Sequence, residues 1–125
     1  MPVSCVVDKT APFARVYFTD PYAFDDWRRV FERLREDPTF AFRRQIGVLS
    51  DRTDVGPVPP PFTPRVATYL ATHASILRDR RIAIAVRDAD STVAAWRLAT
   101  VYEEAGAFCT VFQSRSEAER WLQPA

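Results

Sequence analysis

Three short segments of this chain carry the polar side chains best suited to binding or catalysis. They are Asp51-Arg52-Thr53, Thr63-Pro64-Arg65 and Asp88-Ala89-Asp90-Ser91. Arginine forks and unpaired N–H groups at a helix start bind carboxylates and phosphates, whereas paired carboxylates can transfer protons. The segments therefore predict a binding rim for an anion or a partner, and their carboxylates leave an enzyme as a further alternative.

Most motifs of catalysis are missing. The chain has three glycines and contains neither a glycine-rich phosphate loop nor a Gly-x-Ser-x-Gly elbow. Its single histidine, His73, falls on the apolar stripe of an expected helix, where a satisfied core role is expected rather than a pair with a nucleophile. Asp88 and Asp90 alone are too few to hold a metal ion. We therefore expect no enzymatic activity, no metal and no cofactor.

A strand–turn–helix unit must position the last of these segments. Residues 81–87 alternate Ile or Val with Ala, so both faces of the expected strand are apolar, as in a central strand covered by helices on both sides. The segment Asp88-Ala89-Asp90-Ser91 then reads as a helix start, with Ser91 as the cap of a helix that runs to residue 105. Such a unit is typical of α/β folds.

The remaining segments extend this unit to the order β-β-α-β-α-β-α-β-α. Strands are predicted at residues 3–8, 13–18, 45–51, 81–87 and 108–112, and helices at 24–36, from Thr63 as N-cap to 77, 91–105 and after Ser114. Right-handed crossovers then make most of the strands parallel. Six residues are expected to be almost wholly buried, namely Trp27, Val30, Leu70, Ile84, Leu98 and Trp121.

A proline-rich segment, residues 54–61, precedes the second long helix. It holds four of the ten prolines, which forbid sheet pairing and favour an extended backbone. One interpretation is a stiff connector between strand and helix. The other is a docking segment or a lid, because long irregular loops on a rigid scaffold often carry binding.

Length and composition limit the class of protein. A chain of 125 residues that is 47% hydrophobic is expected to form a single domain over residues 1–125. The net charge of +1 gives no overall field that would attract nucleic acid, and no apolar stretch is long enough for a membrane span. Without a visible signal peptide, and with Cys5 and Cys109 expected as free thiols, the protein is expected to be cytoplasmic.

Arginine replaces lysine almost throughout the chain. Lys9 is the one lysine among the 17 basic residues. This bias is expected from a GC-rich genome, and the alternative is selection for guanidinium forks that bind carboxylates or phosphates.

The order of these elements resembles the SpoIIAA-like fold, which is shared by STAS domains, small bacterial STAS-like proteins and the related CRAL-TRIO lipid-transfer domains. Four motifs carry the resemblance, which covers nearly the whole chain: residues 46–51 are similar to the family's strand ending in Asp, residues 81–86 to its central strand, Tyr102-Glu103 to the end of its third helix, and Val111-Phe112 with Ala118 and Trp121-Leu122 to its C-terminal signature. The resemblance implies a mixed sheet of about five strands with four helices.

The resemblance also has a regulatory side. STAS antagonists of anti-sigma factors are switched by serine phosphorylation at the start of their second helix. This chain has residues 59–64, Pro-Pro-Pro-Phe-Thr-Pro, at the matching place, and Thr63 is the only hydroxyl there. The sequence thus departs from the family at the residue that carries the switch.

The expected function is a non-catalytic binding or regulatory module. It is expected to contact a protein partner or an anionic ligand at the carboxyl ends of the parallel strands. The candidate residues are Asp51, Arg52, Thr53, Thr63, Arg65, Asp88, Asp90 and Ser91. The alternative is a carrier of a small apolar or anionic ligand, of CRAL-TRIO type. A large cavity under the first or second helix would favour the carrier, whereas a filled core with an exposed rim would favour the partner module; a homodimer stays open.

Overall fold

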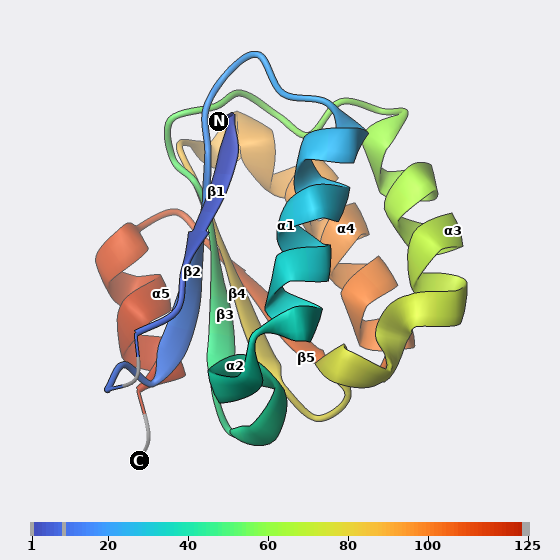
Figure 1. Ribbon diagram of the computed structural model, residues 1–125. Coiled ribbons are helices and arrows are strands. Elements are labelled where there is room, and N and C mark those ends of the chain that lie inside the picture. The colour runs from blue at the N-terminus through green and yellow to red at the C-terminus, as the bar shows by residue number, and fades with distance from the viewer. Residues whose placement is uncertain (1, 9, 124–125) are drawn as a thin grey trace.

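The computed structural model describes residues 2–8 and 10–123, and its helices and strands alternate as the apolar pattern predicts (Figure 1). The strands are β1 (Val3–Val6), β2 (Phe13–Phe18), β3 (Gly47–Arg52), β4 (Arg81–Val86) and β5 (Phe108–Phe112). The helices are α1 (Phe24–Glu36), α2 (Pro38–Phe42), α3 (Phe62–His73), α4 (Thr92–Glu104) and α5 (Arg115–Leu122), with 3₁₀ turns η1 (Ala74–Leu77) and η2 (Ala89–Ser91). The predicted α/β class is confirmed.

In the described part of the chain the strands form one mixed sheet of five, in the order β1-β2-β3-β4-β5. The hairpin β1–β2 is antiparallel, and β2 to β5 run parallel to one another. β3 is the middle strand, and β4 is an interior strand between β3 and β5. Because parallel strands end at the same edge, the segments that follow β2, β3, β4 and β5 are brought together there.

Helices cover the two faces of the sheet unequally. Figure 1 shows α1, α3 and α4 on one side and α5 on the other. Leu49, Ala83 and Ala85 of the sheet pack with Ala118 and Leu122 of α5, whereas the larger core lies between the sheet and the other helices. This arrangement explains why β4 is apolar on both faces.

Close packing at the start of β3 accounts for a glycine. A Cβ atom added at Gly47 would lie 2.8 Å from the carbonyl oxygen of Arg81 and 2.8 Å from the side chain of Leu122. The close backbone approach that a glycine inside this strand predicts is therefore present.

The expectation of four helices is wrong by one short helix. Asp37-Pro38 ends α1 as predicted, but the same pair also begins α2. The Asp37 side chain accepts a hydrogen bond from the Phe40 N–H at 3.1 Å, and Pro38 occupies the first helical position. An Asp cap followed by proline favours a helix start, so one dipeptide serves two helices.

The burial expected of the six core residues is confirmed for five and wrong for Trp121. Trp27, Val30, Leu70, Ile84 and Leu98 are each at most 4% exposed. Trp121 is half-buried. It belongs to α5, which covers its face of the sheet without a second long helix beside it, so part of the ring is left open to solvent. Its ring packs against Phe112 and lies under the guanidinium of Arg81, 4.3 Å from the ring centroid.

Candidate functional site

The three candidate segments lie along the edge where the parallel strands end, which is at the top of Figure 1. The register places Tyr17 beside Asp51 and Arg52 beside Val86, so β2, β3 and β4 end at nearly the same height. The loops that precede α1 and α3 cross this edge. The structure therefore brings the segments to one end of the molecule, but it gives their side chains different surroundings.

Asp51 lies on the face that α5 covers and is 1% exposed. Its carboxylate accepts hydrogen bonds from the backbone N–H of Thr53 at 3.1 Å and from the Thr53 hydroxyl at 2.7 Å. The Arg115 Nε atom lies 2.7 Å from the same carboxylate, and the Arg15 guanidinium lies 3.9 Å away. Asp51 and Thr53 thus fasten α5 to the sheet.

Arg52 points to the opposite face and is also 1% exposed. Its guanidinium carbon lies 4.5 Å from the ring centroid of Phe18, 5.1 Å from that of Tyr22 and 5.9 Å from that of Phe62. The Nη2 atom donates a hydrogen bond to the Tyr22 hydroxyl. We call Phe18, Tyr22 and Phe62 the aromatic box, and its rings stabilise the buried cation by cation–π attraction.

One nitrogen of this guanidinium stays unsatisfied. Among the described residues, Arg52 Nη1 is the buried side-chain nitrogen or oxygen that has no hydrogen-bond partner. Leaving a charged donor buried without an acceptor costs about 1–3 kcal/mol or more. A native structure that keeps such a group needs a reason for it.

A second buried arginine shows how the chain satisfies a guanidinium when the role is structural. Arg80 donates to the backbone carbonyl oxygens of Ile76, Arg43, Ile46 and Phe40, at distances of 2.5 to 3.1 Å. Burial lowers the pKa of Arg80 to about 10, which leaves the group charged at neutral pH. Arg80 lies at the other end of the strands, next to α2, and closes that end of the core.

The segment after β4 is a structural turn. The backbone N–H and the hydroxyl of Ser91 donate to the Asp88 carboxylate at 3.0 and 2.9 Å. The Ser91 hydroxyl, with help from its N–H and from Arg87, lowers the pKa of Asp88 below its ordinary value. Ser91 was predicted to cap the following helix, but within the described chain its side chain makes no cap bond to α4. The side-chain cap lies one turn earlier, where Asp88 caps η2. Asp90 is exposed beside it.

The start of α3 also differs from the expectation. α3 begins at Phe62 with Pro61 as N-cap, and Thr63 lies inside the first turn, so the prediction of Thr63 as the cap is wrong. The extended segment ends two residues earlier than expected, at Pro61, because the fixed φ of proline already suits the helix. Within the described chain no side chain caps α3, and its first turn carries no acidic residue.

Arg65 is the exposed cation of this first turn. Its guanidinium carbon lies 4.6 Å from the ring centroid of Phe24, and no carboxylate among the described residues forms an ion pair with it. Two surface grooves, of about 370 and 200 Å³, meet at Arg65. The first is lined by Phe24, Pro64, Arg65, Thr68 and Tyr69, and the second by Tyr22, Ala23, Phe24, Pro59, Pro61, Phe62 and Arg65. We call Phe24, Pro59, Pro61, Pro64 and Arg65 the α3-start surface.

The proline-rich segment is held in place by two valines. Val55 is fully buried and Val58 is 5% exposed, and both belong to the main core. The neighbouring prolines Pro57, Pro59, Pro60 and Pro61 are exposed. The segment is thus a fixed cover over the strand ends that presents prolines outward.

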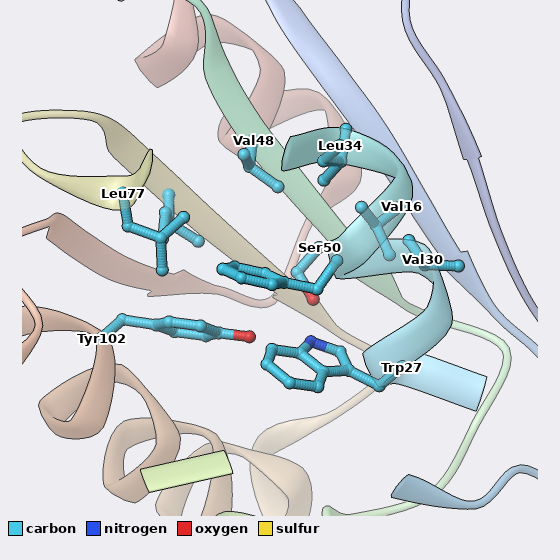
Figure 2. A pocket seen from close by; sticks show the side chains of 10 residues that line it. Val16, Trp27, Val30, Leu34, Val48, Ser50, Leu77 and Tyr102 are labelled. Carbon is cyan, nitrogen blue, oxygen red and sulfur yellow. The ribbon is translucent and has the colours of Figure 1, made fainter. Parts of the chain in front are cut away.

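A small cavity of about 30 Å³ lies under α1, between that helix and the sheet (Figure 2). It is lined by Val16, Trp27, Val30, Phe31, Leu34, Val48, Ser50, Leu77, Ile82 and Tyr102. Burial raises the pKa of Tyr102, although the nearby Trp27 indole N–H and the positive charge of Arg52 both act to lower it. The space is enough for no more than a few water molecules.

Several residues of this region were not among the candidates. Tyr22, Phe24 and Phe62 read in sequence as ordinary apolar residues near helix starts, and no signal marks them as walls of a groove. The burial of Arg52 did have a signal, because strand alternation places it on the same face as Val48 and Ser50, toward the core. The burial of Arg80 had no such signal, since Arg80 lies just before β4 and outside the predicted strand.

No family model, curated protein or solved structure matches this chain. In the described part of the chain, no group of three or more His, Cys, Asp or Glu side chains could hold a metal ion. Nor does any helix there combine the length and apolar character needed to cross a membrane.

Proposed function

We propose that this chain is a non-catalytic binding module of STAS-like architecture that contacts an acidic protein partner through the α3-start surface. The observation that carries the proposal is Arg65, an exposed cation stacked on Phe24 between two apolar grooves. Arginine beside aromatic rings is typical of the residues that contribute most to protein interfaces. Because Arg65 has no acidic neighbour in ion-pair contact in the described structure, a partner carboxylate can pair with it directly.

The surroundings of Asp51 and Asp88, two carboxylates at the ends of the parallel strands, support a role other than catalysis. Asp51 is occupied by Arg115 and Thr53, and Asp88 is held in its ionised form by Ser91. A general acid at neutral pH needs a raised carboxyl pKa, and the Asp88 pKa is lowered. His73 stacks on Tyr69 at a centroid distance of 4.2 Å, as a packed histidine does.

The carrier alternative has less support. A ligand carrier encloses most of its ligand, in a cavity of about 300–1,000 Å³ for drug-sized molecules. The cavity under α1 measures about 30 Å³, and the larger spaces are open grooves on the surface. A filled core with an exposed rim favours the partner module. We further propose a reducing compartment such as the cytoplasm, which the free cysteines Cys5 and Cys109 support.

The test begins with native mass spectrometry of the purified protein, which reports subunit number and any copurified ligand. Tagged wild-type protein and the variants Arg65→Ala and Arg29→Ala are then used to capture partners from a lysate of the source organism, and the captured protein is identified and titrated in purified form. Arg29 is the matched control, because it is an exposed arginine on α1.

We expect Arg65→Ala to weaken binding of the purified partner about tenfold, as for a charge-assisted contact, while thermal stability stays unchanged. Arg29→Ala should bind as the wild type does. Equal binding by all three proteins would refute the α3-start surface as the contact, and a partner that is a second copy of the chain would replace the acidic partner with a homodimer.

A further inference from the structure

The aromatic box around Arg52 combines a buried cation with an unused donor. The rings of Phe18, Tyr22 and Phe62 surround the guanidinium, and in the described structure Nη1 has no acceptor while Nη2 bonds the Tyr22 hydroxyl. The box therefore satisfies the charge of the cation but only part of its hydrogen-bonding capacity. Arg80, by contrast, is bonded to four backbone carbonyl oxygens.

A carboxylate has the shape needed to bond both terminal nitrogens of the Arg52 guanidinium, of which only Nη2 now has a partner. Its two oxygens can accept parallel hydrogen bonds from Nη1 and Nη2, which is the bidentate geometry that arginine favours. The Tyr22 hydroxyl offers one oxygen and so occupies one of the two positions. A bound carboxylate would replace that hydroxyl and fill the vacant acceptor position at the same time.

The way to the guanidinium passes through Tyr22. Tyr22 lies in the loop between β2 and α1, is only half-buried, and lines the groove of about 200 Å³ together with Phe62. Loop side chains open at a lower free-energy cost than side chains of core strands. Rotation of Tyr22 away from Phe62 would join the groove to the aromatic box.

The groove fits the remainder of an aromatic acid. Its walls are Tyr22, Phe24, Phe62 and two prolines, and Arg65 stands at its rim. An enclosed cavity of roughly 150 Å³ accommodates benzene in a protein, and this open groove of about 200 Å³ offers a comparable volume. Rings prefer edge-to-face neighbours, and the Phe24–Phe62 pair, which does not involve Tyr22, shows such an arrangement at a centroid distance of 6.3 Å and an interplanar angle of 66°.

We propose that Arg52 anchors a binding site for a small aromatic monocarboxylate, which enters by the groove and displaces the Tyr22 hydroxyl from Nη2. This ligand site does not depend on the acidic protein partner. The two proposals fail separately, because one is read from partner binding by Arg65 variants and the other from binding of a small molecule to the protein alone.

Benzoate is the probe, and benzamide is its neutral match at the same ionic strength. Each is titrated into protein labelled with ¹⁵N at arginine, and the guanidinium signals of Arg52 and Arg80 are followed by NMR. The variants are Tyr22→Phe, Arg52→Met and the control Arg29→Met, and benzoate affinity is measured by calorimetry. If Arg52→Met does not fold, the Arg52 signals of the wild type and of Tyr22→Phe still decide the question.

We expect benzoate to bind the wild type about tenfold or more tightly than benzamide and to shift the Arg52 signals, while those of Arg80 stay in place. Tyr22→Phe should bind benzoate about three- to tenfold more tightly, because the competing hydroxyl is gone. Folded Arg52→Met should lose the preference for benzoate, and Arg29→Met should keep it. Benzoate that binds no better than benzamide, or that leaves the Arg52 signals unmoved in both the wild type and Tyr22→Phe, would overturn the proposal.

Discussion

Asp51 and Arg52 are neighbours at the end of β3, and their side chains leave the sheet on opposite faces, each 1% exposed. Asp51 meets Arg115 of α5, and Arg52 enters the aromatic box beside α1 and α3. The pair is adjacent in sequence but does not form an ion pair, because strand alternation separates the two side chains by the thickness of the sheet.

This separation divides the predicted rim into two parts. On the α5 face, the carboxylate has a full set of donors and the contact is structural. On the other face, the cation has rings and one hydroxyl, and it is next to the grooves of the α3-start surface. Binding chemistry is therefore expected on the side of α1 and α3.

The two helix starts at α3 and α5 predict different responses to cap substitutions. Ser114 accepts a hydrogen bond from the Glu117 N–H at 3.3 Å and is a true N-cap of α5, whereas Thr63 caps nothing in the described structure. Ser114→Ala should lower the free energy of unfolding by about 1 kcal/mol. Thr63→Ala should change it by less than about 0.5 kcal/mol. Urea unfolding of both variants provides the comparison, and equal losses would show that the cap assignment at α3 is wrong.

Apolar periodicity was sufficient to predict the five strands and the major helices in their order along the chain. It succeeded because the burial of apolar side chains determines where these strands and helices form, as the alternation in residues 81–86 shows. It did not predict α2, since a five-residue helix has too few turns to show a period. It also could not show that Arg52 and Arg80 are buried with such different partners, because those partners are rings and carbonyl groups far away in sequence.

Arg80 and Arg81 form a matched pair for testing the closed end of the core. Arg80→Met would leave the buried carbonyl oxygens of Phe40 and Ile46 without their donor, and we expect a loss of about 3–5 kcal/mol in the free energy of unfolding. Arg81 is exposed and contacts the Trp121 ring, so Arg81→Met should cost about 0.5–1 kcal/mol. Denaturant titration of the two variants checks this order. A loss for Arg80→Met no larger than that for Arg81→Met would exclude a structural role for the carbonyl contacts.

The two cysteines should be free thiols of low reactivity. Burial raises the pKa of both Cys5 and Cys109, and Cys109 is the more deeply buried. Thiol titration of denatured, unreduced protein should count two groups. In the native protein both should react more slowly with an alkylating reagent than a small-molecule thiol does, with Cys109 slowest, because only the thiolate is nucleophilic. A count of zero would contradict the expectation of a reducing compartment.

The Asp88–Ser91 turn predicts a pH dependence of stability with a definite sign. The Ser91 hydroxyl and N–H lower the pKa of Asp88 from its ordinary value of 3.8, so the ionised carboxylate is stabilised in the folded protein. A lowered carboxyl pKa contributes stability above the unfolded value, and the contribution is lost as the pH falls through the folded value. Asp88→Asn should therefore be less stable than the wild type at pH 7, and the difference should shrink below pH 3.8.

Asp90→Asn is the control for this turn, because Asp90 is exposed and only two residues away. Its substitution should leave the free energy of unfolding nearly unchanged at both pH values. Urea unfolding at pH 7 and at a pH below 3.8 measures the four differences. If Asp88→Asn loses as much stability in acid as at neutral pH, the hydrogen bonds from Ser91 do not require the ionised carboxylate. The Asp88 side chain would then stabilise the turn after β4 in either protonation state, and its charge would not be the source of that stability.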